Sequence, residues 1–574
     1  MPAPALCRRH GPDRLPSPRR RLSRAVATLL LGGAAAALAQ TPPPDAGRLL
    51  QQTQPVSPAL PATQAPPRIV EPPMRPTVTL PEGVTVEVSS FRISGARSFP
   101  ESTLAPLLQP WVGRRLDLRG LNEAAGAITR HYQAAGHLLT YAYLPAQRIE
   151  GGVVEVAVLE GRIEAVQVVT AQDVRLRDEV VQAHVDPLAG QVPLLQADIE
   201  RRLLLLNDIP GVTARAAFTP GASAGSADVV VSVAEDEPLA LRAELDNHGS
   251  RSTGEMRVGL GLRLADVFGR GDQFGARALV TQRGRLLSGH LDAQMPLGGD
   301  GWRVGAHLSR LSYQLAGAFA ALGASGSANV VGVHARYPLV RSMDFNLGAR
   351  AGFEHKRLAD DIELTASRNP RRNDVFELAV SADGRDRWGA TAASLVAYAG
   401  DLTFHDELRR QQDAAGLLTG RAWRKLGAQF VRQQTLYGPL SLLLRVAGQA
   451  SGGNLDSSEK LSLSGPGAVR AYAPGEAAVD QGALGSAELR YSLDYQGGNL
   501  VGALFVDHGR GLVNRRPLVA AGNEARLSGA GLGLQWTGGE MGLSASLAWR
   551  GDRAPLAEGG DPRPRVYLQF WVAP

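Results

Sequence analysis

The sequence of 574 residues is short of cysteine, of charged residues and of long apolar runs. Its single cysteine, Cys7, lies in the segment that we expect to be removed on export, so disulfides and thiol chemistry are excluded from the mature chain. Charged residues make up 20% of the chain, a low value for a soluble protein of this length. After the first 39 residues, no stretch approaches about eighteen consecutive apolar residues, which excludes a transmembrane helix from that part of the chain.

The first 39 residues have the features of a secretory signal. Four arginines between positions 19 and 24 precede an apolar run at 25–37, and residues 37–39 (ALA) match a cleavage site. We therefore expect Gln40 to begin the mature chain. A single-pass anchor is the alternative, and it is disfavoured because the apolar run is too short to span a bilayer.

The mature chain is expected to carry no net charge. The whole chain has 61 basic and 55 acidic residues, and residues 1–39 hold seven arginines and one aspartate. Removing these leaves 54 residues of each sign. The basic pI of the full sequence therefore gives no support for nucleic-acid binding.

Residues 238–574 alternate in the way that membrane-spanning strands do. Residues 258–264 (VGLGLRL) place apolar side chains at every second position, and residues 566–572 end the chain with the same pattern. We count roughly sixteen such segments, each near the length of a tilted transmembrane strand. The 66 glycines suit an antiparallel barrel with a crowded polar interior. A soluble β-sandwich or propeller is the alternative, but it would need more aromatic residues than the 5% present.

Two short segments precede the folded part of the mature chain. Residues 45–54 (DAGRLLQQTQ) predict a short helix with one apolar patch at Leu49 and Leu50. Residues 55–81 are dense in proline, which predicts an extended linker. The sequence therefore places a small helical element on a long tether.

Residues 84–237 contain an internal repeat of two α+β modules. The order strand, helix, helix, strand, strand occurs twice, in units of about seventy-five residues. Each unit is expected to place helices on one face of a three-stranded sheet. The expected elements are strand 84–93, helices 101–109 and 118–135 and strands 140–144 and 153–159, then strand 162–169, helices 177–184 and 194–207 and strands 212–218 and 227–234.

Motifs in the first module resemble those of POTRA domains. They are residues 132–136 (YQAAG), 142–147 (AYLPAQ) and 156–163 (VAVLEGRI). Gly136 can end a helix in a left-handed conformation, so we interpret these residues as structural and not as a site. Three short motifs further along the chain resemble the first barrel strands of proteins that carry POTRA domains. They are residues 246–249 (DNHG), 253–254 (TG) and 271–273 (GDQ).

With its signal, short helix, Pro-rich linker, two POTRA modules and sixteen-stranded barrel, the chain resembles the two-partner secretion transporters, the haemolysin-activator and filamentous-haemagglutinin transporter family. Residues 464–472 (SGPGAVRAY) resemble the family's V-R-G-Y/F loop, which folds into the barrel lumen, and residues 502–509 (GALFVDHG) resemble its F-x-D-x-G strand. Strand parity points Asp507 into the lumen if Leu504 and Val506 face lipid. We therefore expect Arg470 and Asp507 to pair and to anchor the loop, since an arginine–carboxylate pair is strong and directional.

Further candidate residues follow from the same resemblance. The sequence departs from the family pattern at Ala471, where glycine is usual and a left-handed turn would be strained. It departs again at the C-terminus, which does not end on an aromatic residue, although Phe570 lies on the lipid-facing parity. The candidates are Gly465, Gly467, Val469 and Tyr472 in the loop, Phe505 and Gly509 in the strand, and Val212 and Phe218 on a strand that a partner could extend by strand addition.

Motifs for enzymatic chemistry are nearly absent. Residues 457–460 (SSEK) fit the S-x-x-K pattern of a Ser/Lys nucleophile, but no companion motif supports it and we interpret it as chance. His508 follows Asp507 on a strand, so the two side chains point in opposite directions and cannot act together. We find no phosphate-binding loop, no zinc spacing and no nucleophile elbow, and we expect no cofactor and no metal.

The resemblance implies a function and a location. The chain would lie in the bacterial outer membrane with its POTRA modules in the periplasm. There it would recognise an exported partner protein, of the large β-helical adhesin or cytolysin type, and secrete it through the barrel, working as a monomer. The rivals are an insertase for other barrels, which typically has more POTRA modules, and a passive porin, which has none. The expected divisions are signal 1–39, plug helix 40–54, linker 55–81, POTRA modules 82–161 and 162–237, and barrel 238–574.

Overall fold

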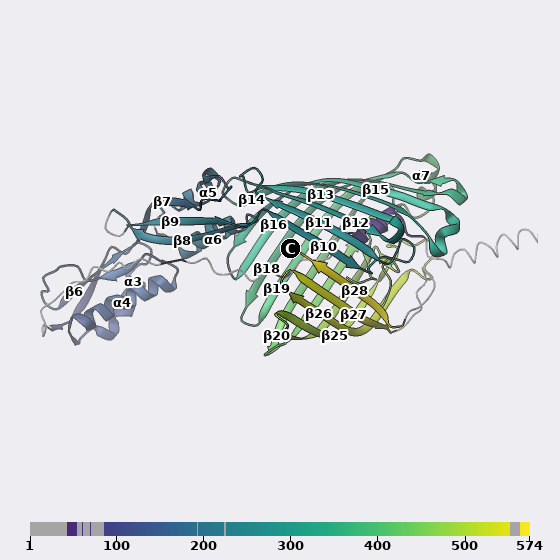
Figure 1. Ribbon diagram of the computed structural model, residues 1–574. Helices are drawn as coiled ribbons and strands as arrows, with labels where there is room; N and C mark the ends of the chain where they lie inside the picture. Colours follow the sequence, from purple (N-terminus) through teal and green to yellow (C-terminus); the bar gives the residue numbers. More distant parts are fainter. Residues whose placement is uncertain are drawn as a thin grey trace, which may run out of the picture.

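The structure, a computed structural model, describes residues 43–53, 60, 69–70, 85–191, 193–222, 226–551 and 563–574. The expected signal, residues 1–39, and most of the Pro-rich segment lie outside these residues. The described chain forms two small α+β modules followed by a closed barrel (Figure 1). No helix in the described ranges is long and apolar enough to cross a membrane.

The first module is a three-stranded sheet, order β3-β6-β5, with two helices packed on one face. Its long helix starts at Asp117, which caps the amide of Gly120, and ends before Gly136, whose φ of +88° is the left-handed conformation expected there. The predicted strand 84–93 is wrong as one strand, because its first half pairs with β4 and its second half with β6. The elements are β2 (Val86–Glu87), β3 (Ser90–Ser94), α3 (Glu101–Leu108), η1 (Gln109–Trp111), β4 (Arg115–Leu116), α4 (Leu118–Ala134), β5 (Tyr141–Tyr143) and β6 (Val153–Leu159).

The second module repeats this topology with sheet order β8-β9-β7, so the internal repeat read from the sequence is present in the fold. Strand β1 (Ile69–Val70), from the Pro-rich segment, pairs in parallel with β8 at Ala216 and Ala217. The edge of this sheet is therefore extended by a strand that the sequence did not predict. The elements are β7 (Arg162–Thr170), α5 (Asp178–Val185), η2 (Asp186–Leu188), α6 (Gln196–Asn207), β8 (Val212–Pro220) and β9 (Ser226–Glu235).

Sixteen long antiparallel strands close into a barrel, which confirms the predicted fold class. Strand β28 pairs with β10 to complete the ring, and this closing contact joins residues 243–246 to residues 569–572. The two-residue strand β17 (Ser367–Arg368) pairs only with the end of β16. The long strands are β10 (Leu239–Asp246), β11 (Arg257–Ala265), β12 (Gln273–Thr281), β13 (Leu286–Leu297), β14 (Trp302–Gln314), β15 (Ala324–Arg341), β16 (Phe345–Ile362), β18 (Arg371–Asp386), β19 (Gly389–Phe404), β20 (Ala422–Tyr437), β21 (Leu440–Ser451), β24 (Gln481–Tyr495), β25 (Gly498–Leu512), β26 (Glu524–Gly538), β27 (Met541–Arg550) and β28 (Arg565–Val572).

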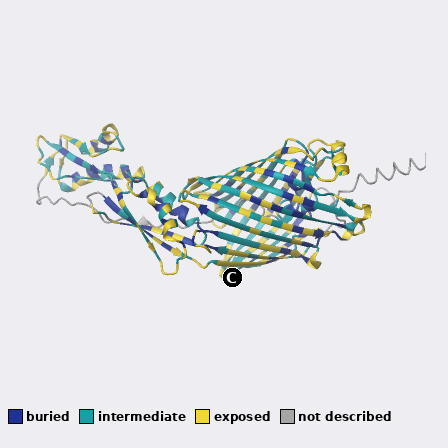
Figure 2. Cartoon of the chain, turned by 90° about the horizontal axis from the view of Figure 1, so that it is seen from above, coloured by how far each residue is buried: buried dark blue, intermediate teal, exposed yellow. Residues whose placement is uncertain are grey.

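Side chains alternate between the outer and inner faces of the barrel wall (Figure 2). On β25, Leu504 and Val506 are exposed on the outside, whereas Phe505 and Asp507 are buried on the inside. Because directly paired residues on neighbouring strands share a face, the register extends this assignment around the whole barrel. The predicted parity of Asp507 is therefore confirmed.

The second module packs against the turns at one end of the barrel, which we call the near end. Arg341, at the end of β15, makes a bidentate ion pair with Asp208, with N–O distances of 2.8 and 2.9 Å. Arg202 on α6 donates to the carbonyl of Gly299, at 3.2 Å, and to Asp300, at 3.0 Å, in the β13–β14 turn. The opposite, far end carries the loops, among them helix α7 (Glu407–Ala414) (Figure 1).

Candidate functional site inside the barrel

A loop from the far end folds back into the barrel. It comprises residues 463–477, which we call the lumen loop, and lies between two short paired strands, β22 (Leu461–Ser462) and β23 (Ala478–Val479). Its apolar side chains form a cluster with the inner wall. The buried members of the cluster are Leu463, Val469, Ala471, Tyr472, Val479, Phe505, Leu527 and Ala548.

Arg470 and Asp507 are in direct contact inside the barrel. The guanidinium of Arg470 donates from Nε to Asp507 Oδ2 at 2.9 Å and from Nη2 to Oδ1 at 2.7 Å. The backbone N–H of Arg470 adds a third bond to Oδ2, at 3.1 Å. The guanidinium carbon also lies 3.4 Å from the ring centroid of Phe505. This fork geometry fixes both the position and the orientation of the loop.

Glu488 on β24 is a second carboxylate for Arg470, and the sequence reading missed it. Arg470 Nη1 donates to Glu488 Oε1 at 2.8 Å, and Arg445 and Arg490 bind the same carboxylate, each at 2.9 Å. Glu488 has the inward parity of Ser486, which accepts a bond from Arg470 at 3.1 Å. The inward parity of Glu488, on the strand before the Asp507 motif, could have predicted from the sequence that this carboxylate faces the lumen.

Glycines on the inner wall make room for the loop. A Cβ on Gly529 would lie 2.6 Å from the Cβ of Ala471, and a Cβ on Gly509 would lie 3.3 Å from Val469. A Cβ on Gly531 would overlap the ring of Phe505. Glycine at 529 and at 531 is therefore required for Ala471 and Phe505 to keep their places, whereas a Cβ at 509 would be in close contact with the loop.

The departure at Ala471 causes no backbone strain. Ala471 is not among the residues with positive φ, so the left-handed turn considered from the sequence is not formed there. Gly465 does adopt positive φ, at +113°, next to Pro474, and Gly467 is exposed at the tip of the turn. Tyr472 is buried, and its carbonyl accepts a bond from the hydroxyl of Tyr567 on β28 at 2.8 Å. Phe570 faces outward, as predicted.

The predicted short helix, α2 (Ala46–Thr53), lies inside the barrel (Figure 1). Leu49 and Leu50 are buried in an apolar cluster on the inner wall that includes Leu279, Leu311 and Tyr313. These wall residues come from β12 and β14, so the helix packs on one side of the lumen. Its apolar patch is therefore matched by an apolar patch on an otherwise polar inner face.

The N-terminal end of α2 is held by a buried charge cluster, the Arg371 cluster, made of Arg371, Asp45, Asp360 and Asp456. Arg371 is fully buried, lies 3.5 Å from Asp45 and 2.8 Å from Asp456, and pairs with Asp360. Asp360 also accepts the backbone N–H of Ala46, at 2.8 Å. One guanidinium is thus shared among three carboxylates, one of which belongs to the helix segment.

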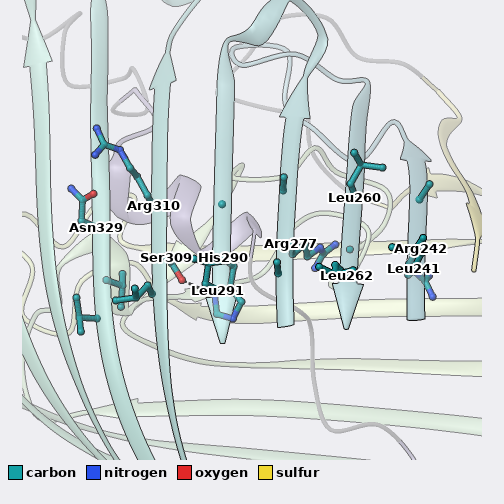
Figure 3. Close-up of a pocket in the computed structure, with 18 of the residues that line it drawn as sticks. Leu241, Arg242, Leu260, Leu262, Arg277, His290, Leu291, Ser309, Arg310 and Asn329 are labelled. Carbon is teal, nitrogen blue, oxygen red and sulfur yellow. Dashed lines mark hydrogen bonds between the residues drawn. The ribbon is translucent and has the colours of Figure 1, made fainter. Parts of the chain in front are cut away.

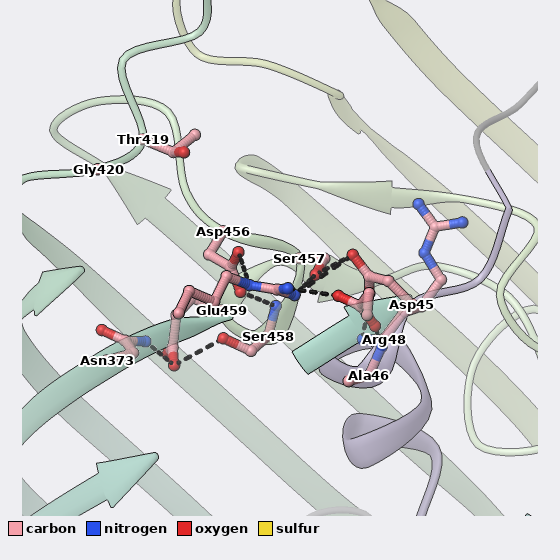
Figure 4. Close-up of polar contacts among 12 residues, drawn as sticks. Asp45, Ala46, Arg48, Asn373, Thr419, Gly420, Asp456, Ser457, Ser458 and Glu459 are labelled. Atoms are coloured by element: carbon pink, nitrogen blue, oxygen red, sulfur yellow. Dashed lines mark hydrogen bonds and ion pairs between the residues drawn. The ribbon is translucent and has the colours of Figure 1, made fainter. Parts of the chain in front are cut away.

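The far-end segment around η6 (Ser457–Glu459) supplies the remaining polar contacts of α2 (Figure 4). Ser457 donates to Asp45 at 2.7 Å, and Gln51 donates to the carbonyls of Ser458, at 2.8 Å, and Lys460, at 2.7 Å. Arg48 reaches the carbonyl of Gly475 in the lumen loop at 3.5 Å, the longest of these contacts. The helix therefore bridges the inner wall, the η6 segment and the lumen loop.

A buried ion network holds the η6 segment itself. Glu459 binds Lys356 on β16 at 2.9 Å and Lys425 on β20 at 2.8 Å, and it also accepts from Asn373 at 2.9 Å. Trp423 donates to the other end of that asparagine, at 3.0 Å. The network ties the segment across β16, β18 and β20, which fixes the surface that α2 contacts.

Other candidates from the sequence lie elsewhere. Val212 and Phe218 are on β8 in the second module, and both side chains point into that module's core. Ser457 binds Asp45, whereas Lys460 Nζ binds the carbonyl of Val513 at 2.5 Å and Asp480 at 3.1 Å, so the S-x-x-K residues have separate structural partners. In the described ranges, no group of three or more His, Cys, Asp or Glu side chains could hold a metal ion.

Two family profiles match the chain. The profile described as "Haemolysin secretion/activation protein ShlB/FhaC/HecB" matches residues 225–536, and the profile "POTRA domain, ShlB-type" matches residues 86–161. The heme/hemopexin transporter protein HuxB of Haemophilus influenzae (strain 86-028NP) is 26% identical over 487 residues, which is 82% of this chain and 83% of that protein. The outer membrane transporter CdiB of Escherichia coli is 27% identical over 193 residues, 34% of this chain and 32% of that protein.

Solved structures share the fold. CdiB from Escherichia coli aligns with a TM-score of 0.69 at 20% identity, over 87% of this chain and 93% of that chain. CdiB from Acinetobacter baumannii aligns with a TM-score of 0.60 at 15% identity, over 98% and 100%. The barrel therefore lies in the outer membrane, with the POTRA domains in the periplasm, so the near end is periplasmic and the far end extracellular. Because the first profile covers more than half of the 574 residues, the chain belongs to the haemolysin secretion/activation family of outer-membrane transporters, whose members secrete partner proteins through the barrel.

Proposed function

We propose that α2 and the lumen loop together close this transporter at rest, and that α2 leaves the lumen when the partner protein passes. The observation that carries the proposal is the position of α2. This helix is not part of the barrel wall, and it lies in the lumen with its two leucines buried against the inner face of the wall. The lumen loop occupies a second sector of the same space and is fixed by Arg470. A chain in transit and both of these elements would compete for the lumen.

The contacts of α2 suit reversible binding. The helix has eight residues and buries two leucines, and most of its other contacts are single hydrogen bonds. Helices of this length are marginal in water, so α2 would lose its structure once it left the wall. The chain between α2 and β1, residues 54–68, gives the length for such a movement.

Recognition of the partner is assigned to the periplasmic modules. Strand β8 is the last long strand of its sheet, and its pairing with the two-residue β1 supports the idea that this side of the sheet accepts an added strand. Because Val212 and Phe218 point inward, recognition there would rest on backbone hydrogen bonds along β8. A partner strand would have to displace β1 or extend beyond it.

The partner is proposed to be an exported polypeptide that crosses unfolded. HuxB is named for heme and hemopexin, and CdiB as an outer membrane transporter; for this chain we propose a large β-helical exoprotein of adhesin or cytolysin type. No nucleotide is present outside the inner membrane, so folding of the partner at the cell surface would drive transport. The transporter would act as a monomer, without a cofactor and without enzymatic activity.

Two other functions are less well supported. An insertase for barrel proteins shares the POTRA-plus-barrel plan, but the two modules and the tethered helix favour secretion. A passive porin would need an open lumen and no periplasmic modules, whereas α2 and the lumen loop fill space inside this barrel.

The plug role is tested by deleting residues 45–54 and measuring single-channel conductance in planar bilayers. We expect higher conductance, with secretion of the partner largely retained. Replacing residues 55–64 with a Gly/Ser segment of the same length is the control; it keeps the chain length between α2 and β1 and should leave conductance unchanged. If deleting 45–54 also leaves the conductance unchanged, the plug role is wrong.

The recognition role is tested by binding. Purified residues 80–237 are expected to bind the N-terminal domain of the partner encoded beside this transporter. Proline at Ala216, on the edge that pairs with β1, removes a backbone donor and should weaken binding. Binding of that domain to the isolated barrel alone would overturn the assignment.

A further inference from the structure

The outer face of the barrel differs between its two rims. The periplasmic rim carries exposed aromatic side chains, among them Trp302, Phe345, Trp388, Tyr437 and Tyr495. The middle of the wall is apolar. Arginines occur at the extracellular rim, on the positions of the strands that face outward. The two leaflets of the membrane therefore meet different chemistry on this wall.

Three of these arginines lie in one cross-strand row. Arg310 on β14 pairs in register with Asn329 on β15, Asn329 with Arg357 on β16, and Arg357 with Arg372 on β18. Paired residues share a face, and neighbouring strands are about 4.8 Å apart, so the row brings three cations within roughly 15 Å. Two positions further toward the membrane centre, the same face carries exposed Leu308. The row thus lies at the extracellular edge of the apolar middle part of the wall.

The row has an excess of positive charge. Arg372 lies 3.1 Å from Asp374, and Arg357 donates to His355 Nε2 at 3.0 Å. The other ring nitrogen of His355 contacts the same Asp374, at 2.5 Å, so a single carboxylate serves this whole group. Arg310 has no hydrogen bond or ion pair with any described residue. Asp401 on β19 pairs in register with Asp374, so three arginines against two aspartates leave a net charge of about +1 on a surface that faces lipid.

An apolar groove of about 900 Å³ adjoins the row on the same outer face (Figure 3). Leu260, Leu291, Leu308 and Val331 line it, and all four are exposed. Its floor is recessed because the outward positions between them are small. The row meets the groove at Arg310 and Asn329, which lie side by side on neighbouring strands. The small outward residues of the floor are Ala276, Ala278 and Gly289.

We propose that this surface binds a phosphorylated glycolipid of the outer leaflet, with its phosphates on Arg310, Arg357 and Arg372 and an acyl chain in the groove. A bilayer lipid is the proposed occupant for two reasons. The groove opens toward the hydrocarbon region of the membrane, and the arginines lie at the level of the lipid headgroups. A phosphate supplies the anion that Arg310 lacks, and guanidinium forks match phosphate oxygens. The alternative is that these arginines only extend their charged ends to water. That role would require neither their alignment in one cross-strand row nor an apolar groove beside them.

The headgroup contact is tested on purified full-length transporter with diphosphorylated lipid A, by native mass spectrometry. Arg310→Gln/Arg357→Gln should weaken binding by about tenfold or more. Arg510→Gln/Arg526→Gln removes two outward arginines from β25 and β26 at the same rim and should bind as the parent does. Lipid A without phosphates should bind the parent and both variants equally weakly. Parent-like binding by the first variant, or equal losses in the two variants, would overturn the proposal.

The groove is tested by filling it. A Cβ on Gly289 meets no atom within 4 Å, so Gly289→Leu should fold normally while occupying the groove. Gly502 also faces outward with no neighbour within 4 Å, and Gly502→Leu is the matched control. Heat-modifiable migration in gels checks that each barrel is folded. Gly289→Leu should lower lipid affinity severalfold while Gly502→Leu does not; equal affinities of the two folded variants would refute the groove as the acyl site.

Discussion

Arg470→Ala is expected to release the lumen loop from the wall. The side chain of Asp507 is 0% exposed and would lose two guanidinium bonds, keeping the backbone N–H of residue 470. Glu488 would keep Arg445 and Arg490. The cost therefore falls on Asp507, whose buried charge is left almost without a partner.

The free-energy cost of Arg470→Ala can be estimated from the loss at Asp507 alone, because Glu488 keeps its other partners. Removing one partner of a buried ion pair costs about 3–5 kcal/mol, and water in the lumen should reduce this to roughly 1.5–3 kcal/mol, the range for a charged hydrogen bond. At 1.4 kcal/mol per factor of ten, the docked loop becomes about 10- to 150-fold less favoured. Asp507→Asn should cost less, because Arg470 then keeps Glu488. Arg470→Ala/Asp507→Asn should be no worse than Arg470→Ala, since it removes the unpaired charge.

Loop docking can be measured by a disulfide. A Cβ on Gly509 would lie 3.3 Å from Val469 Cγ2, within reach of a disulfide, and Cys7 is the only native cysteine. Val469→Cys/Gly509→Cys should cross-link efficiently in the parent and poorly with Arg470→Ala. Secretion, normalised to barrel in the outer membrane, should fall in parallel. Undiminished cross-linking and secretion with Arg470→Ala would refute the anchor.

Three further outcomes are expected. Arg371→Ala leaves three carboxylates facing one another and should raise single-channel conductance toward that of the α2 deletion, while Arg368→Ala, an exposed arginine, should not. Gly299→Ala should loosen the second module from the barrel by about 1–3 kcal/mol, seen as faster proteolysis between them, because its Cβ would overlap a backbone carbonyl of α5; Gly502→Ala is the control. Burial lowers the pKa of His184 at this joint, so the free side chain takes up a proton below about pH 6.5 before the docked one does, and acid should destabilise docking. His184→Gln should flatten the dependence of the thermal midpoint on pH between 7.5 and 5.5, and an unchanged slope would count against this.

The barrel and modules could be predicted because their signals are local. Alternation fixes which residues of β25 face inward, and the parity of Asp507 follows from the apolar Leu504 and Val506 alone. The expected helix 118–135 ends at Ala134, two residues before Gly136, which stops it. Helix α2 was predicted from its leucine pair, but its place against β14, β15 and β16 depends on contacts hundreds of residues away.

The site was predicted only in part for the same reason. Arg470 and Asp507 were found through a resemblance in two motifs, and the structure brings them together. Glu488 and Arg371 were missed because a charged residue on a barrel strand has no local feature that separates a lumen contact from an exposed one. The β1 strand was missed because proline density marks a linker and does not show where two residues of it will pair. The contacts of Glu488 and Arg371 and the pairing of β1 depend on how distant segments come together. The residue pattern of a single strand does not show this.

The central claim, that α2 must leave the lumen, is tested most directly by tethering it there. Ser457 Oγ lies 2.7 Å from Asp45 Oδ2, so Asp45→Cys/Ser457→Cys can be joined by a short thiol cross-linker that a reductant cleaves. The partner protein appearing in the medium is then measured before and after cleavage, with Ser457→Cys alone as the control. The account predicts that the cross-linked transporter stops secreting and recovers when the linker is cleaved. Secretion at the parent rate by the fully cross-linked transporter would contradict it.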